Sequence, residues 1–176
     1  MHDCIISSYK TILSDNPRLT CRITGLEDRS PARIILDKNL NISLSSNIFN
    51  DSKIYRTIIF YSKFNKEKIN ILNKMKVETF RLPLSVNKNF DLNQILLKVK
   101  LLGFQRVFVE AGMRLSLAFL QGNLVDDFNL FISNKSLKAN GSNNIKKYLK
   151  LVLKDKKSVI EKVNLFGEKL LNYKIK

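Results

Sequence analysis

The sequence is poor in the residues that build metal centres and disulfide frameworks. It contains two cysteines, Cys4 and Cys21, and a single histidine, His2. Zinc sites and disulfide-stapled folds need more of these residues, so we expect neither a metal site nor a disulfide framework. Cys4 lies in an apolar run and is expected to pack as a small core residue.

Long apolar runs and linkers are also lacking. No run approaches the roughly 20 apolar residues that a membrane span needs. Asp3 and the polar residues after Tyr9 interrupt any signal-peptide core, so we expect a cytoplasmic protein. With 176 residues, 44% hydrophobic, six glycines and three prolines, the chain shows no linker that would mark a boundary. It is therefore interpreted as one domain, large enough to bury a core.

Acidic residues are scarce, since 15 of them face 31 lysines and arginines, for a net charge of +16. Such a balance suggests nucleic acid as one partner. The lysines are scattered, however, except in residues 146–157, and no aromatic-rich strand accompanies them as an RNA-binding platform requires. Nucleic acid is therefore disfavoured, and the charge suits a phosphorylated small molecule equally well.

Apolar runs and helical patterns alternate along the chain, which predicts an α/β fold with a mostly parallel sheet flanked by helices. Two last runs around Phe166-Gly167-Glu168 predict a C-terminal antiparallel hairpin, after a polar loop at Lys135–Asn144. The predicted strands are Cys4–Ser7, Ala32–Asp37, Thr57–Tyr61, Val77–Leu82, Arg106–Glu110, Asp127–Ile132, Val159–Leu165 and Leu170–Ile175. The predicted helices are Lys66–Met75, Leu92–Leu102 behind an Asp91 N-cap, a helix from Gly112 to Gln121, and Ile145–Leu153 as a helix or edge segment.

The stretch Thr11–Arg22 is predicted to form a polar loop, because Asp15-Asn16-Pro17 continues neither a strand nor a helix. Loops at the carboxyl ends of strands hold ligand contacts in open α/β sheets. Thr11 and Asp15 could bind ribose hydroxyls, and Arg22 could grip a phosphate. Equally, Asp15 could shape its own turn while Arg22 lies on the surface. Asp37, at a strand end, is likewise either a turn cap or a ligand contact.

A second candidate loop lies at Glu110-Ala111-Gly112, between a predicted strand and helix. A glycine opening a helix lets a phosphate approach the backbone, where the first N–H groups and the helix dipole favour an anion. The alternative is that the glycine serves packing alone. Asp126 and Asp127 could add carboxylates near the sheet, although a solvated loop is the favoured interpretation. The dinucleotide, P-loop and nucleophile-elbow patterns are absent.

Three blocks of the sequence resemble one enzyme family. Thr11–Arg22 is similar to the Thr-x-x-x-Asp-[Asp/Asn]-Pro-x-Leu-Thr-x-Arg signature of the reductase half of the bacterial bifunctional riboflavin-biosynthesis deaminase/reductase. Pro31–Asp37 with Leu40 and Ser46–Phe49 resembles that family's Pro-x-Arg-[hydrophobic]₃-Asp…Ser-x-Leu-Phe stretch. Val109–Gly112 through Leu120, with Leu124–Asp127, resembles its Val-Glu-[Gly/Ala]-Gly…Leu-Val-Asp-Glu block.

The resemblance implies a dihydrofolate-reductase-like fold and an NADPH-dependent reduction. The family reduces the ribosyl group of 5-amino-6-(5-phosphoribosylamino)uracil to a ribitylamino chain, with hydride delivery to C1′. By the same resemblance, substrate would be lined by Leu19, Arg22 and Glu110. The implied cofactor contacts are Thr11, Asp15, Gly112, Met113, Arg114, Leu115, Ser116, Leu117 and Ala118. A homodimer is the oligomeric state that the family implies.

The chain departs from the family pattern in places. Ala111 replaces a common glycine, and Lys38 stands where a serine often contacts the cofactor. The family's first strand and helix and its N-terminal zinc deaminase domain are not found in residues 1–176, so we expect Met1 to be an internal methionine or the start of a truncated gene. The alternatives are an inactive or partial reductase-like fragment, a related enzyme acting on another pyrimidine or pterin, and a nucleic-acid binder.

Overall fold

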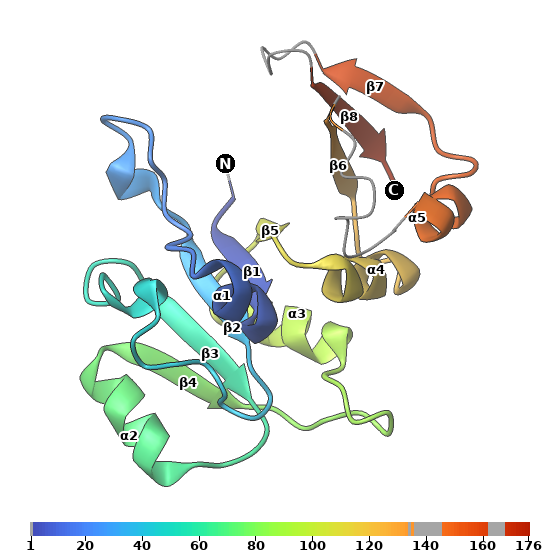
Figure 1. Cartoon of the computed structure of the whole chain (residues 1–176). Helices are drawn as coiled ribbons and strands as arrows, with labels where there is room; N and C mark the ends of the chain where they lie inside the picture. Colours follow the sequence, from blue (N-terminus) through green and yellow to red (C-terminus); the bar gives the residue numbers. More distant parts are fainter. Residues whose placement is uncertain (1, 134, 136–145, 162–167) are drawn as a thin grey trace. The chain divides into compact units, whose positions relative to one another are not determined.

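The computed structural model describes residues 2–133, 135, 146–161 and 168–176, and the chain forms two compact units, Met1–Gly112 and Met113–Lys176. The first unit is built on a five-stranded sheet of order β4-β3-β2-β1-β5, with every neighbouring pair parallel (Figure 1). The mostly parallel sheet is thus confirmed. Its strands are β1 (Cys4–Ser8), β2 (Ala32–Leu36), β3 (Thr57–Tyr61), β4 (Val77–Arg81) and β5 (Val107–Val109).

The central strands are apolar on both faces because helices or loops cover both. All five residues of β3 are buried, as are four of the five in β2. Ile6, Ile34 and Ile58 are in register across three strands and have no exposed surface. Continuous β-branched runs of this kind are typical of parallel strands that are buried on both sides.

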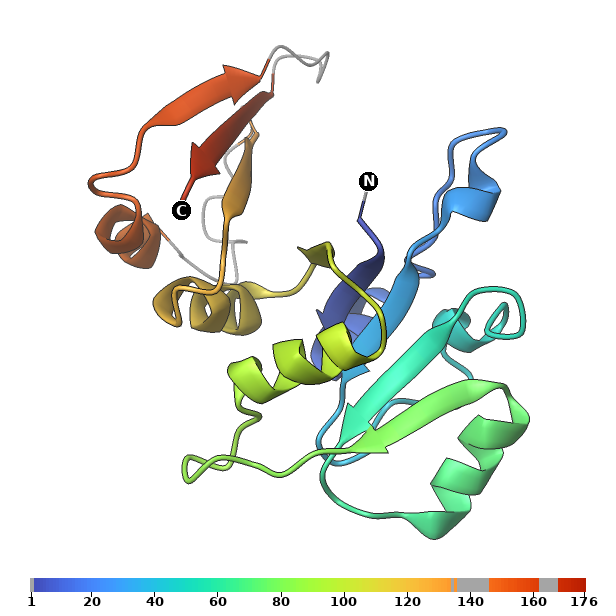
Figure 2. The same ribbon diagram turned by 180° about the vertical axis from the view of Figure 1, so that it is seen from behind.

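Three helices pack on this sheet from its two sides. Ile12 of α1 (Tyr9–Asp15) and Leu72 of α2 (Lys66–Lys74) share one apolar cluster with Ile35 and Ile59 of the sheet. Helix α3 (Leu92–Leu101) lies on the side away from α1, in front of the sheet in Figure 2. The side chain of Asp91 caps α3 by accepting from the backbone N–H of Asn93, as the sequence predicts.

The second unit is described by itself. It contains α4 (Met113–Gln121), α5 (Lys146–Val152) and an antiparallel sheet of order β6-β8-β7. Its strands are β6 (Asp127–Ile132), β7 (Ser158–Glu161) and β8 (Lys169–Lys174), so the antiparallel finish is confirmed. The predicted loop at 136–144 and the turn at Phe166-Gly167 lie outside the described residues. Within the described part, no helix has the length and apolar character of a membrane span.

The loop predicted at Thr11–Arg22 is wrong in its first part. Residues Thr11–Asp15 are helical, and only the residues from Asn16 onward leave the helix. Ser8 forms the N-cap, accepting from the backbone N–H of Thr11, and Asn16 closes the helix in a left-handed conformation (φ 44°) before Pro17. The serine cap and the following proline define a seven-residue helix that is too short to show an apolar stripe.

Candidate functional site

The carboxyl ends of β1 and β5 bring two predicted cofactor residues into contact. These strands are parallel neighbours, and the backbone N–H of Glu110 donates to the carbonyl of Ile6 at 3.0 Å. Two residues later the N–H of Gly112 donates to Oγ1 of Thr11 at 3.4 Å. The Thr11 hydroxyl also lies 3.1 Å from the Ser8 hydroxyl. A chain segment that starts α1 and one that ends β5 therefore meet at this edge.

Helix α1 places Asp15 on the same face as Thr11. Residues four positions apart in a helix are neighbours, so their side chains lie one turn apart. Asp15 is exposed and ends the helix, whereas the Thr11 side chain is half-buried. The pair therefore places a hydroxyl and a carboxylate on one side of α1. These are the threonine and the aspartate of the Thr-x-x-x-Asp part of the motif.

Leu19 and Arg22 lie toward the other edge of the sheet. The carbonyl of Arg18 accepts from Arg33, the second residue of β2, and the N–H of Cys21 donates to Ser30, which precedes that strand. The segment 18–21 is therefore beside the amino end of β2, because α1 has carried the chain back along the sheet. The expectation that all of Thr11–Arg22 lies at the carboxyl end of a strand is wrong. Arg22 is exposed, and Leu19 packs against the apolar cluster.

A buried arginine that the sequence analysis did not single out lies beside this segment. Arg33 has no exposed surface and forms an ion pair with Asp51 at 2.5 Å. Its guanidinium also donates to the carbonyls of Arg18 and Tyr55 and to Oγ1 of Thr57. Arg33 is the arginine of the Pro-x-Arg-[hydrophobic]₃-Asp pattern that Pro31–Asp37 resembles, but that pattern assigns it no role. Its burial follows from partners that are distant along the chain.

Asn16 links the first motif to the second. Its side-chain oxygen accepts from the backbone N–H of Asn47 at 2.8 Å, and its carbonyl accepts from Nδ2 of Asn47 at 3.0 Å. Asn47 begins a short 3₁₀ helix, Asn47–Phe49. The blocks that carry the family resemblance, Thr11–Arg22 and Pro31–Phe49, are thus joined by hydrogen bonds as well as by order in the sequence.

Asp37 stabilises the loop after β2. It is fully buried, and its Oδ2 accepts from the backbone N–H of Ile42 at 2.8 Å, which favours the interpretation as a turn cap. Its Oδ1 has no hydrogen-bond partner among the described residues. Lys68 donates to the carbonyls of Leu40 and Ile42 in the same loop. Burial lowers the pKa of the Lys68 ammonium, and the charge of Asp37 opposes that shift.

Gly112 is not required by local packing. A Cβ built on it would meet nothing within 4 Å in the described part of the chain, and its φ is not in the left-handed region. Among the described atoms, close packing against a neighbour therefore does not account for glycine at this position. The open space in front of the backbone fits the interpretation that a ligand approaches there.

The other predicted residues lie in the second unit. Met113–Ala118 form the first part of α4, where Leu117 is buried and Arg114 is exposed. Asp127 pairs with Lys174 at 2.5 Å on exposed surface of the antiparallel sheet. Its carboxylate is thus engaged within that sheet, at the first residue of β6. Groups of three or more potential metal-ligating side chains are absent from the described part of the chain.

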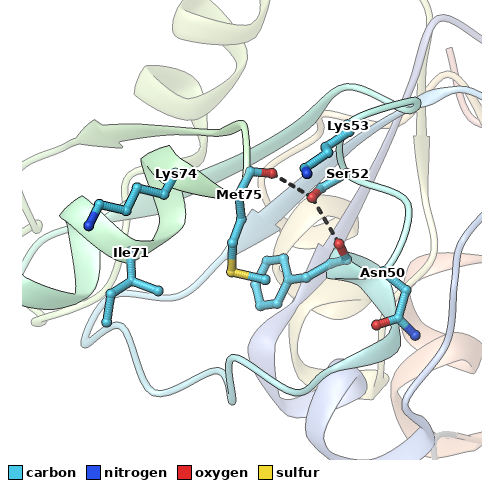
Figure 3. A pocket seen from close by; sticks show the side chains of 7 residues that line it. Asn50, Ser52, Lys53, Ile71, Lys74 and Met75 are labelled. Carbon is cyan, nitrogen blue, oxygen red and sulfur yellow. Dashed lines mark hydrogen bonds between the residues drawn. The ribbon is translucent and has the colours of Figure 1, made fainter.

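One cavity of about 340 Å³ lies apart from these residues (Figure 3). It is lined by residues from the turn before β3 and from the end of α2, and Ser52 at its wall bonds to the carbonyls of Phe49 and Met75. Because these segments precede β3 and β4, the cavity lies at the amino edge of the sheet. None of the site residues predicted from the sequence lines it.

Comparison with known proteins decides the family. Residues 1–163 match the family described as the RibD C-terminal domain. The chain belongs to the RibD C-terminal domain family. This confirms the family that the three sequence blocks predict.

Named relatives extend this result. The chain is 34% identical over 131 residues to the riboflavin biosynthesis protein RibD of Aquifex aeolicus, covering 74% of this chain and 35% of that protein. It is 27% identical over 139 residues to the 2,5-diamino-6-ribosylamino-4(3H)-pyrimidinone 5′-phosphate reductase of Archaeoglobus fulgidus, covering 73% of this chain and 60% of the relative. The chain thus spans about a third of the length of the RibD relatives it matches.

Solved structures share the fold. The riboflavin biosynthesis reductase Rib7 of Saccharomyces cerevisiae superposes with a TM-score of 0.72 at 19% identity, covering 98% of this chain and 75% of that one. RibD of Acinetobacter baumannii superposes with a TM-score of 0.71 at 18% identity, covering 98% of this chain and 47% of that one. These likenesses confirm the dihydrofolate-reductase-like fold.

Proposed function

We propose that this chain is a reductase of riboflavin biosynthesis that reduces the ribosyl group of 5-amino-6-(5-phosphoribosylamino)uracil with NADPH. The observation that carries the proposal is the contact between Thr11 and Gly112 at the carboxyl ends of β1 and β5. It joins the first and third family blocks at the edge of the sheet where ligands of open parallel sheets bind. Family membership supplies the reaction class.

The residues at this edge fit a nicotinamide dinucleotide. The Thr11 hydroxyl and the Asp15 carboxylate, on one face of α1, suit ribose hydroxyls and amide groups. At Gly112 an added Cβ would meet nothing within 4 Å among the described atoms, which leaves room for a phosphate to approach the chain. Bound NADPH would supply the hydride, while the protein supplies binding and orientation.

To reduce the substrate, the enzyme must bind its 5′-phosphate and hold its sugar in a fixed orientation. Reduction breaks the bond between C1′ and the ring oxygen, adding a hydride at C1′ and a proton at that oxygen. Arg22 is exposed and could bind the 5′-phosphate through two parallel hydrogen bonds. We assign the Glu110 carboxylate, exposed at the end of β5, to the substrate and leave the proton donor unassigned.

The same proposal includes two partners. We infer a homodimer, supported by apolar side chains that stay exposed on the antiparallel sheet, among them Phe131, Val159 and Ile160. We also infer a deaminase domain as the second partner, since the RibD relatives are about three times as long as the matched part.

The test is a reductase assay on the purified chain, following loss of NADPH absorbance with 5-amino-6-(5-phosphoribosylamino)uracil. Parallel reactions replace this substrate by 2,5-diamino-6-ribosylamino-4(3H)-pyrimidinone 5′-phosphate and NADPH by NADH. A second protein joins the chain to the deaminase domain of a RibD relative. Turnover with either pyrimidine supports the reductase assignment, and the preferred pyrimidine identifies the substrate. Failure of both proteins to bind NADPH in a fluorescence titration would contradict it.

Thr11→Val tests the site itself. Removing the hydroxyl deletes the hydrogen bond proposed to a ribose hydroxyl of NADPH, together with the contact with Gly112. We therefore expect the Kd for NADPH to rise about tenfold, which corresponds to the loss of one hydrogen bond. Thr24→Val, the same change at an exposed threonine of the turn before the 3₁₀ helix Glu27–Arg29, serves as the matched control. Equal Kd values for the two variants would remove Thr11 from the cofactor site.

A further inference from the structure

Arg33 is a charged side chain at the centre of a hydrogen-bond network within the first unit. It is fully buried on β2, yet it makes five hydrogen bonds to four oxygen atoms. A buried guanidinium is tolerated only when its charge is paired and its donors are satisfied. Asp51 supplies the charge, and its side chain is 20% exposed. The network is therefore complete without any ligand.

One of those bonds joins the core to the segment that carries Leu19 and Arg22, the two substrate residues predicted after α1. Nη1 of Arg33 donates to the carbonyl of Arg18 at 3.0 Å. The next residue, Leu19, is in the left-handed region with φ 56°, which is unfavourable for a leucine. Such conformations persist where surrounding contacts hold them, and they gather at functional sites. Here the Arg18 carbonyl is held by Arg33, and the Leu19 side chain packs against the apolar cluster.

The other bonds fix Arg33 itself. Oγ1 of Thr57, the first residue of β3, accepts from Nε and Nη2, and the Tyr55 carbonyl accepts from Nη2. The Arg33 side chain is thus held by β3 and by the turn before it. A lysine has a compact ammonium in place of the planar guanidinium with its five N–H donors, so it could not make all these bonds together. The sheet therefore sets the position of the Arg18 carbonyl through one rigid side chain.

We propose that Arg33, held by Asp51, is a positioning residue for the substrate. By fixing the carbonyl of Arg18 it keeps Leu19 in its left-handed conformation and so orients the segment that carries Arg22 toward the substrate phosphate. The inference rests on the proposed function for the role of Leu19 and Arg22. The hydrogen bonds that join Arg33 to Asp51 and to the Arg18 carbonyl, here called the Arg33 clamp, lie within the first unit alone. Arg33 touches neither cofactor nor substrate in this arrangement.

Two variants weaken the Arg33 clamp in different ways. Asp51→Asn keeps an oxygen that can accept from Arg33 but removes the negative charge that pairs with it. Arg33→Lys keeps the positive charge and removes the planar guanidinium. Glu78→Gln is the matched control, because it makes the same carboxylate-to-amide change beside Arg56, in an exposed ion pair on β4. If Arg33→Lys does not fold, Asp51→Asn carries the test.

The first measurement does not depend on function. Trypsin cleaves after Arg18 and Arg22 when this segment opens, and after Lys88 in the exposed turn before α3 as an internal reference. We expect cleavage after Arg18 and Arg22 to become several-fold faster in Asp51→Asn than in the native chain, with cleavage after Lys88 unchanged. Glu78→Gln should match the native chain at all three positions.

The second measurement separates positioning from mere stability. By calorimetry, Asp51→Asn should weaken binding of 5-amino-6-(5-phosphoribosylamino)uracil about tenfold or more, since small misplacements of binding groups are costly, and should leave the Kd for NADPH unchanged. Substrate affinity equal to that of the native chain, with faster cleavage after Arg18, would overturn the inference alone. A native chain that binds neither substrate nor NADPH would overturn the proposed function and this inference with it.

Discussion

At the scale of single residues, burial separates the two thiols of the chain. Cys4 is fully buried, and burial, assisted by the charge of Asp3, raises the pKa of its thiol to about 12. At about pH 8 roughly one Cys4 thiol in ten thousand is therefore ionised, and the thiolate is the reactive form. Cys21 is half-buried on the segment after α1. We predict that one thiol per native chain reacts rapidly with a disulfide reagent at that pH, and that both react in denaturant. Rapid reaction of a native Cys21→Ser variant would contradict the prediction.

The sequence predicts residues well where one local property decides their place. Cys4 is an example, because a small apolar residue inside an apolar run is a core residue, and the structure buries it completely. Arg33 is the opposite case. Nothing near it in the sequence pairs its charge, and its partners Arg18, Asp51 and Thr57 lie 15 to 24 positions away. Buried ion pairs depend on tertiary contacts, which a single sequence does not show.

At the scale of elements, a carboxylate joins β5 to the start of β1. The backbone N–H groups of Arg106 and Gln105 donate to Oδ2 of Asp3 at 2.8 Å, and these bonds lower the pKa of Asp3 below 3.8. A lowered pKa in the folded state means that the carboxylate stabilises the fold above pH 3.8, and that this contribution is lost as the pH falls through the lower, folded value. Asp3→Asn removes this titration while keeping an acceptor oxygen.

We therefore predict that the free energy of unfolding of the native chain, minus that of Asp3→Asn, decreases as the pH is lowered from about 5 to about 2.5. Urea titrations of both proteins across that range measure the difference, in which the titration of all other carboxylates cancels. A difference that stays constant with pH would show that the two N–H bonds do not favour the charged form. The same bonds align β5, and hence Gly112, with β1, so Asp3→Asn should also weaken NADPH binding.

The elements that the sequence predicts are those with a pattern long enough to recognise. The apolar runs of β2 and β3 and the apolar stripe of α3 are found within one or two residues of their observed ends. Helix α1 is missed because its seven residues bury only Ile12, so the cap at Ser8 is its main signal. The strand order β4-β3-β2-β1-β5 depends on pairings between distant segments, and no local pattern encodes it.

At the scale of the whole molecule, net charge and exposed apolar surface act against each other. A charge of +16 on each copy opposes self-association, and it also draws phosphorylated ligands. The antiparallel sheet of the second unit exposes Val159 and Ile160 on β7, and Phe131 and Ile132 on β6. Adjacent strand residues point to opposite faces, so apolar surface is present on both sides of this sheet. Such surface favours a partner that covers it.

The proposed homodimer should therefore strengthen with salt. Raising the salt concentration from about 0.1 M to about 1 M shortens the screening length from about 10 Å to about 3 Å, which reduces repulsion between the copies and leaves apolar burial intact. We predict that light scattering shows a growing dimer fraction over this range. Ile160→Lys should shift the chain toward monomer at every salt concentration, whereas Ile54→Lys, at an exposed position of the first unit, should not. Loss of the dimer at high salt would instead indicate an interface held by charge, and equal behaviour of the two variants would place it away from β7.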